Sequence, residues 1–203
     1  MKLYWCPQTR SLRAIWMLEE AETPYQRVRI EIRDPASRAN PEFRAASPMG
    51  KVPALEDGAV RIWDSGAICA YIADQYPAKE LAPPIGHPDR GRYLMWLMYT
   101  NAVIEPAMAE KVAMLAPNPS RYGWGSWEQM LETLRKGIER GPWILGERFS
   151  AADVLLGMSC HFMRLFKMLD DDPVLFAYAD RCVARPACQR AQALESAAIA
   201  AAG

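Results

Sequence analysis

The chain has 203 residues, of which 51% are hydrophobic and 24% are charged, and this composition excludes an intrinsically disordered protein. Lysines and arginines total 24, as do aspartates and glutamates, so the chain lacks the basic excess that is typical of proteins binding nucleic acid or a membrane surface. The five cysteines form no CxxC pair and there are only two histidines, so we expect no metal site. Without a secretory signal or an apolar run of membrane-spanning length, the expected location is cytoplasmic, with reduced thiols.

Strand and helix patterns alternate at the beginning of the chain. Lys2–Trp5 is a short apolar run that predicts a strand, and Ser11–Ala21 carries apolar side chains at helical spacing. Ala36–Ala46 is polar and is expected to be partly helical. Before that segment and after Ser11–Ala21 comes Arg27–Ile32. Its residues alternate strictly between apolar and charged, which predicts a half-buried strand.

A hairpin and a helix complete this first region. Val52–Glu56 and Ala59–Trp63 are two short runs that flank Asp57-Gly58, which is a strong hairpin signal. Asp64–Tyr76 then predicts a helix. The predicted order β-α-β-(α)-β-β-α makes residues 1–78 an α/β domain.

The character of the chain changes after this domain. Four prolines and a glycine lie close together between residues 77 and 88, and proline denies a helix its hydrogen bonds, so residues 79–89 are predicted to be a linker. Residues 90–203 carry only helical patterns and are predicted to form an all-helical domain. The predicted helices are Arg90–Leu115, Trp127–Arg140, Ala151–Leu169, Val174–Val183 and Pro186–Ala202.

The turn between the first strand and the first helix is the first candidate for chemistry. It contains Cys6, Pro7, Thr9 and Ser11. The N-terminus of a helix favours anions and lowers the pKa of a thiol held there, and a hydroxyl of Thr9 or Ser11 could donate a hydrogen bond to the thiolate. In the alternative interpretation these hydroxyls only cap the helix.

Val52-Pro53 is the second candidate. Bonds that precede proline are the ones that often adopt the cis form. A cis bond would turn the backbone of Val52 outward, where it could pair with a peptide-like ligand. The alternative is an ordinary trans proline at the beginning of an edge strand.

Two predicted helix starts carry capping residues. Asp64 and Ser65 could bind a ligand's ammonium and carboxylate groups, or could simply cap the helix that follows. Ser150 and Asp153 form a capping box before an apolar helix, which we assign to folding.

In this order and spacing, four segments resemble the glutathione transferase family: KLYWCPQTRSLRAIWMLEEA, SPMGKVPAL, DSGAICAYIAD and FSAADVLLG. The resemblance implies a thioredoxin-like βαβ-ββα domain followed by a C-terminal helical bundle, in a protein that is usually a homodimer. It also implies that glutathione binds to the first domain as co-substrate.

The resemblance assigns roles to particular residues. Val52, before a cis Pro53, would pair with the cysteinyl backbone of glutathione, Asp64 and Ser65 would hold its γ-glutamyl end, and Lys51 would lie near its glycyl end. The second substrate, an electrophile and most simply an apolar one, would lie against the first helix of the second domain. The candidates for that wall, which could equally belong to the helix core, are Tyr93, Trp96, Thr100, Ile104 and Met108.

Two sequence patterns compete in assigning the residue that activates the sulfur of glutathione. Pro7-Gln8-Thr9 followed by Arg13 is similar to the serine-type classes, with threonine in place of serine. Cys6-Pro7 with the same arginine is similar to the omega-like and glutaredoxin-like classes. The cysteine of the beta class would fall near Arg10, so the chain departs from that class, and Tyr4 is interpreted as structural.

Three functions therefore remain at this stage. The first is a transferase in which Thr9 stabilises the thiolate of glutathione for attack on an electrophilic carbon. The second is a thiol transferase or dehydroascorbate reductase in which Cys6 forms a mixed disulfide with glutathione. The third is a module of the same fold that binds a partner protein and catalyses nothing.

Overall fold

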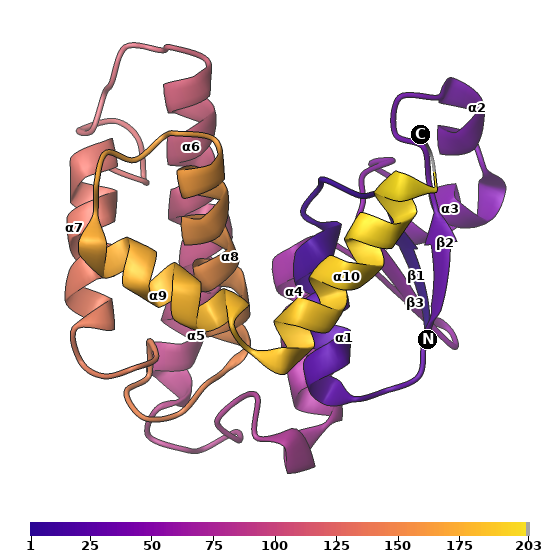
Figure 1. Ribbon diagram of the computed structural model, residues 1–203, viewed down its shortest axis with the longest axis horizontal. Coiled ribbons are helices and arrows are strands. Elements are labelled where there is room, and N and C mark those ends of the chain that lie inside the picture. The colour runs from indigo at the N-terminus through magenta and orange to yellow at the C-terminus, as the bar shows by residue number, and fades with distance from the viewer. Residues whose placement is uncertain (202–203) are drawn as a thin grey trace. The chain divides into compact units, whose positions relative to one another are not determined.

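In the computed structural model, residues 1–201 are described, and they form two compact units (Figure 1). The first unit contains Met1–Lys79 together with the C-terminal segment that begins at Arg185, and the second contains Glu80–Ala184. Within residues 1–201, no helix is both long and apolar enough to cross a membrane.

The first unit is built on a sheet of four strands. They are β1 (Lys2–Trp5), β2 (Gln26–Arg29), β3 (Ala54–Asp57) and β4 (Val60–Trp63). Their order is β2-β1-β3-β4; β1 runs parallel to β2, and the other two pairings are antiparallel. With the helices described next, this is a thioredoxin-like domain, as the resemblance implies.

Helices pack on both faces of the sheet because its side chains alternate between the faces. On one side, α1 (Ser11–Ala21) packs on α4 (Ser65–Gln75), which contacts β3 and β4. On the other side, the short α2 (Pro35–Arg38) precedes α3 (Pro41–Ala46), and the buried ring of Phe43 in α3 lies 5.7 Å from the ring of Tyr4. The helical part of the first 79 residues ends with η1 (Pro77–Lys79).

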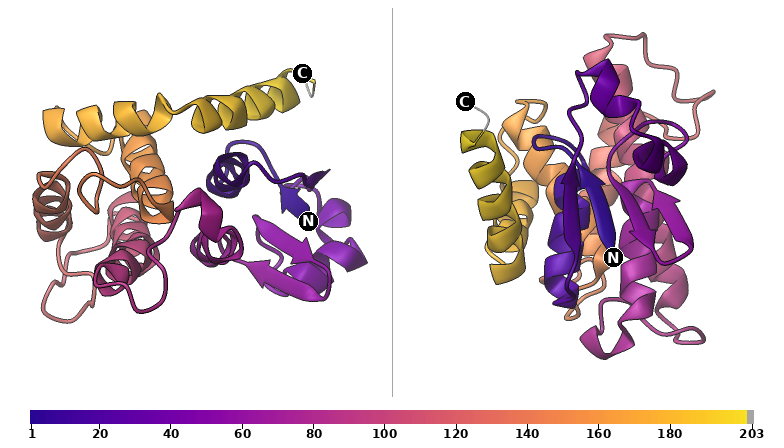
Figure 2. Two further views of the ribbon diagram at one scale, coloured as in Figure 1. Left: turned by 90° about the horizontal axis from the view of Figure 1, so that it is seen from below. Right: turned by 90° about the vertical axis from the view of Figure 1, so that its right-hand side faces the viewer.

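Helix α10 (Pro186–Ala200) belongs to this unit because it lies beside α1 (Figures 1 and 2). Two ion pairs join these helices. The Arg185 guanidinium donates to both carboxylate oxygens of Glu20 at 2.6 and 2.8 Å, and Arg190 donates to Glu19 at 2.8 Å. The compact units group α10 with the sheet, and the domain of residues 90–203 stays a prediction.

β2 and β3 are the strands that differ most from their predicted bounds. β2 ends at Arg29, because Ile30 N–H still donates to Trp5 O at 2.8 Å but β1 ends at Trp5, where Cys6-Pro7 turns away. The following residues up to Ile32 therefore leave the sheet. β3 begins only at Ala54, since Pro53 has no N–H to offer a neighbouring strand.

The second unit is helical. Its elements are α5 (Arg90–Tyr99), η2 (Thr100–Ile104), α6 (Glu105–Val112), α7 (Trp127–Ile138), α8 (Ala151–Leu165) and α9 (Pro173–Val183). Helix α8 is buried almost all round and packs on α5 and α9, so it is the centre of the unit, in agreement with its apolar sequence.

The long helix predicted over residues 90–115 is interrupted by a π-helical turn. Pro106 lacks an N–H and its ring would collide with the carbonyl four residues earlier in a regular helix. The chain widens before it, and Glu105 N–H donates to Thr100 O, five residues back. The sequence interpretation overlooked this proline.

The predicted capping box at the start of α8 is confirmed and is larger than predicted. The carboxylate of Asp153 accepts from Ser150 N at 2.9 Å and Ser150 Oγ at 3.0 Å, and also from Ile144 N and the Tyr178 hydroxyl, both at 2.7 Å. Burial raises the pKa of Asp153 to about 6, against the effect of these hydrogen bonds. The network ties α8, α9 and the segment before α8 together.

Candidate functional site

The turn between β1 and α1 is held together by its own hydroxyl groups. Thr9 Oγ1 lies 2.7 Å from Cys6 O and 2.9 Å from Ser11 Oγ, and it accepts from Ser11 N at 3.1 Å. Ser11 Oγ in turn accepts from Cys6 N at 3.3 Å. Both predicted hydroxyls are thus at the start of α1, where the free N–H groups of a helix attract anions, and Thr9 is partly exposed while Ser11 is buried.

Cys6 lies at the base of this turn with a side chain that is only 5% exposed. Burial is the main cause that raises the pKa of its thiol; a backbone hydrogen bond from Ile32 and the charges of Arg29 and Arg33 act in the opposite direction. A cysteine nucleophile needs a lowered pKa, so this environment is unlike that of a reactive cysteine.

The Val52–Pro53 peptide bond is cis, as the resemblance implies. The loop before it is fixed by Ser47, whose hydroxyl donates to Lys51 O at 2.8 Å and accepts from Lys51 N at 3.0 Å. Within residues 1–201 the backbone N–H and C=O of Val52 make no hydrogen bond. These two groups are available to pair with the backbone of a ligand.

Asp64 and Ser65 stand at the start of α4. Asp64 Oδ1 accepts from Gly66 N at 2.8 Å and Ala67 N at 3.2 Å, so it caps the helix as one interpretation predicts. Its φ of 83° is in the left-handed region, an uncommon conformation for a residue other than glycine that occurs often at binding sites. Ser65 is 4% exposed and accepts from Arg13 Nη1 at 3.4 Å, which joins α4 to α1.

A pocket of about 370 Å³ connects several of these residues. It is lined by Gln8, Thr9, Arg10, Ile32, Arg38, Gly50, Lys51 and Val52. Three of them are cations and none is acidic, so the pocket suits a ligand with carboxylate groups. Arg10 and Arg38 were not predicted, because they are brought to Lys51 only by the folding of separate segments.

A second hollow of about 330 Å³ lies against the same turn. We call the first pocket, of about 370 Å³, the cationic pocket. The second hollow shares Gln8, Thr9 and Ile32 with it. Its other lining residues are Cys6, Pro7, Arg29, Glu31, Arg33 and Ile199. Thr9 therefore lines both spaces.

The five residues predicted for the second-substrate wall are all buried. Their exposed fractions are 5% or less: Tyr93, Trp96, Thr100, Ile104 and Met108. Trp96 packs against Gly137 of α7 and makes an edge contact with Tyr99. This position matches the alternative that these residues form the helix core, and their role in binding substrate stays a prediction.

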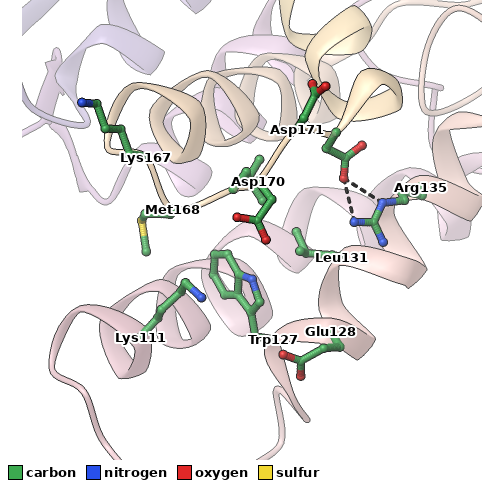
Figure 3. Close-up of a pocket in the computed structure, with 11 residues that line it drawn as sticks. Lys111, Trp127, Glu128, Leu131, Arg135, Lys167, Met168, Asp170 and Asp171 are labelled. Atoms are coloured by element: carbon green, nitrogen blue, oxygen red, sulfur yellow. Dashed lines mark hydrogen bonds and ion pairs between the residues drawn. The ribbon is translucent and has the colours of Figure 1, made fainter.

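A further pocket of about 420 Å³ lies in the helical unit (Figure 3). Trp127 lies in it with Lys111 Nζ 4.7 Å from its ring centre, and Arg135 makes two contacts with Asp172 at 2.8 and 2.7 Å. Lys111, Arg135 and Asp172 are thus already engaged with neighbouring side chains of this pocket. Across residues 1–201, no three histidine, cysteine, aspartate or glutamate side chains gather in a way that could hold a metal ion.

Comparison with known proteins agrees with this geometry. Residues 1–74 match the family model described as the glutathione S-transferase N-terminal domain, and residues 90–181 match that of the C-terminal domain. The glutathione S-transferase GstA of Escherichia coli O157:H7 is 26% identical over 202 residues, which cover 96% of this chain and 98% of that protein.

Two other similar proteins differ in what their names say. The disulfide-bond oxidoreductase YfcG of Escherichia coli K12 is 26% identical over 167 residues, or 75% of each chain. A sphingomonad glutathione S-transferase solved in complex with glutathione is 29% identical, with a TM-score of 0.74, covering 97% of this chain and 99% of its own. The two matched domain models together span most of the chain, which therefore belongs to the glutathione S-transferase family.

Proposed function

We propose that this protein is a glutathione transferase in which Thr9 stabilises the thiolate of glutathione for attack on an electrophilic carbon. The observation that carries the proposal is the position of Thr9, whose hydroxyl lies at the start of α1 and which lines both the cationic pocket and the second hollow. A thiol held there meets a hydroxyl donor and the positive end of a helix, which both favour the thiolate.

The cationic pocket supports glutathione as the first substrate. Glutathione carries two carboxylates, and Arg10, Arg38 and Lys51 supply positive charge around the pocket. The N–H and C=O of Val52, which make no hydrogen bond within residues 1–201, suit the backbone of its cysteinyl residue. Asp64 and Ser65 are the proposed contacts of its γ-glutamyl end.

The hydroxyl pair provides a physical route to thiolate stabilisation. Thr9 has one hydroxyl proton, which is free to rotate between acceptors. If this proton turns from Cys6 O toward the sulfur, the Ser11 hydroxyl can donate to Thr9 Oγ1 across the 2.9 Å that separates the two oxygens. A hydrogen bond to a charged group contributes about 1.5–3 kcal/mol, and a thiol pKa lowered by about 2 from about 8.5 requires about 2.7 kcal/mol.

The reaction balances without a bond to the protein. The thiol proton passes to solvent, the sulfur forms a bond to the electrophilic carbon, and the leaving group departs with its electron pair. With an aryl chloride the products are a thioether, chloride and a proton.

The Cys6-dependent thiol transferase is kept as a second candidate because one similar protein is named a disulfide-bond oxidoreductase. The burial of Cys6 and the raised pKa of its thiol favour the Thr9 route. If the protein instead only binds a partner, glutathione will not raise its melting temperature, since a ligand that binds the native state stabilises it. The homodimer and the cytoplasmic location stay predictions.

The test compares Thr9→Ala, Thr9→Ser and Cys6→Ala. We expect Thr9→Ala to lower kcat/KM with chlorodinitrobenzene by roughly 10- to 100-fold and to raise the pKa of bound glutathione, measured by ultraviolet absorbance of the thiolate. Thr9→Ser keeps the hydroxyl and should retain most of the activity, and Cys6→Ala should retain the lowered pKa of bound glutathione. A Thr9→Ala variant with full rate and an unchanged thiol pKa would refute the assignment, and glutathionylation of Cys6 with loss of activity in Cys6→Ala would support the second candidate.

A further inference from the structure

The hollow beside Thr9 has walls that are fixed by hydrogen bonds. We define the acceptor pocket as this second hollow of about 330 Å³. Gln8, which lines it, donates its backbone N–H to Glu195 Oε1 of α10 at 2.8 Å. Arg29, another lining residue, donates from Nη1 to Ala198 O of α10 at 2.9 Å. The turn and the end of β2 are thereby both held to α10, although these three segments are far apart in sequence.

The charges of the acceptor pocket do not cancel. Arg29 Nη2 lies 3.7 Å from a carboxylate oxygen of Glu31, whose other oxygen accepts from the backbone N–H of Arg33 at 3.3 Å. Glu195 is engaged with Gln8 N–H, and Asp34 caps α2 by accepting from Ala36 N and Ser37 N.

The side chain of Arg33 takes no part in these pairings. Arg33 is exposed, and in the described part of the chain its guanidinium makes no ion pair or hydrogen bond. The apolar side chains of Ile32 and Ile199 lie in the same pocket and are 37% and 42% exposed. The pocket thus combines two apolar contacts with one available cation.

We propose that the acceptor pocket binds the electrophilic second substrate and that Arg33 selects electrophiles that carry a carboxylate or a similar acidic group. The inference rests on the proposed glutathione transferase activity. The pocket and the cationic pocket meet at Thr9, so a sulfur held by Thr9 faces an electrophile in the acceptor pocket. Its volume, at the lower end of the range for small-molecule sites, suits a single substituted ring packed between Ile32 and Ile199.

The selectivity is tested with two electrophiles that differ in one charge. Chlorodinitrobenzene is neutral, and chlorodinitrobenzoate adds a carboxylate to the same ring; in each case the sulfur displaces chloride, which leaves with its electron pair. We expect Arg33→Gln to lower kcat/KM for the benzoate by about tenfold, or about 1.4 kcal/mol, and to change that for the neutral compound less than twofold. Because the interaction is exposed, the preference of the wild-type protein for the benzoate should decrease as salt is added.

Arg61→Gln is the matched control. It removes the same charge from an exposed position on β4, at the opposite edge of the sheet from β2. It should leave the ratio of kcat/KM values for the two compounds unchanged. A second variant, Ile199→Trp, fills the acceptor pocket from a partly exposed position, and we expect it to raise KM for both electrophiles at least fivefold without raising KM for glutathione.

The outcomes separate this inference from the proposed function. If the variants conjugate glutathione but Arg33→Gln affects both electrophiles equally or neither, and Ile199→Trp leaves both KM values unchanged, the acceptor pocket is refuted while the transferase activity stands. If the wild-type protein conjugates neither compound and calorimetry detects no glutathione binding, the proposed function itself is refuted.

Discussion

Removal of the Asp153 carboxylate is a direct test of what holds the helical unit together. In Asp153→Ala, three donors lose their acceptor: the N–H groups of Ile144 and Ser150, and the hydroxyl of Tyr178. Each unpaired buried donor costs about 1–3 kcal/mol, so the three together cost about 6 kcal/mol. The Ser150 hydroxyl can rotate to another partner and adds little.

The burial of the carboxylate offsets part of this cost. The pKa of Asp153 is raised from 3.8 to about 6, so burial disfavours the ionised form in the folded chain by more than these hydrogen bonds favour it. Alanine removes this unfavourable contribution. The expected decrease in the free energy of unfolding at pH 7 is therefore smaller than about 6 kcal/mol, on the order of 3 kcal/mol, which is a large part of the stability of an ordinary domain.

The same pKa sets the pH dependence. Because the folded pKa lies above the unfolded one, the stabilisation that protonation of Asp153 provides is complete below about pH 4 and is lost as the pH rises through about 6. The difference between wild type and Asp153→Ala should thus increase by about 2.4 kcal/mol between pH 7 and pH 4.

Urea unfolding followed by circular dichroism at several pH values measures both quantities. Tyr178→Phe removes only one of the hydrogen bonds and should cost about 2 kcal/mol. A cost of less than 1 kcal/mol for Asp153→Ala at pH 7, or a difference that shrinks on acidification, would contradict the reasoning.

Two further predictions concern packing and the turn at Thr9. Gly137→Ala would drive a methyl group into the Trp96 ring and should destabilise the helical unit by about 1–3 kcal/mol in urea unfolding, while the affinity for glutathione in calorimetry stays unchanged; equal stability would show that α7 shifts without cost. Glu195→Ala removes the acceptor of Gln8 N–H and should raise the KM for glutathione severalfold, whereas Glu195→Gln keeps an acceptor oxygen and should lie closer to wild type; equal KM values for the two variants would mean that this contact does not position the turn.

The elements that depend on local pattern were predicted closely. β1 and α1 have the bounds predicted from their apolar spacing, and the capping box at Ser150 was identified from its sequence. The errors arise where a partner decides the outcome. β2 ends early because β1 ends at Trp5, and the widened turn before Pro106 depends on a clash that periodicity does not reveal.

The candidate site was only partly predictable for a similar reason. Thr9 and Val52 lie within motifs that can be read from a few neighbouring residues. Arg38 and Ile199 reach the two pockets from other parts of the chain, so no local pattern indicates them. Helical spacing placed Trp96 on a defined face of its helix, but the packing of α7 decides that this face is buried.

The pairing of α10 with α1 has a consequence for how the protein is made. All other helices and strands of the described chain are synthesised before α10, yet α10 covers α1. Glu20 and Glu19 of α1 can form their ion pairs only after Arg185 and Arg190 have been made. The first strands of the sheet unit are therefore synthesised before the helical unit and its last helix after it, so one side of α1 stays open to water or to chaperones until α10 has been made. The helical unit is continuous in sequence, so all of its residues are present before α10 is made, and it can fold before the sheet unit is complete.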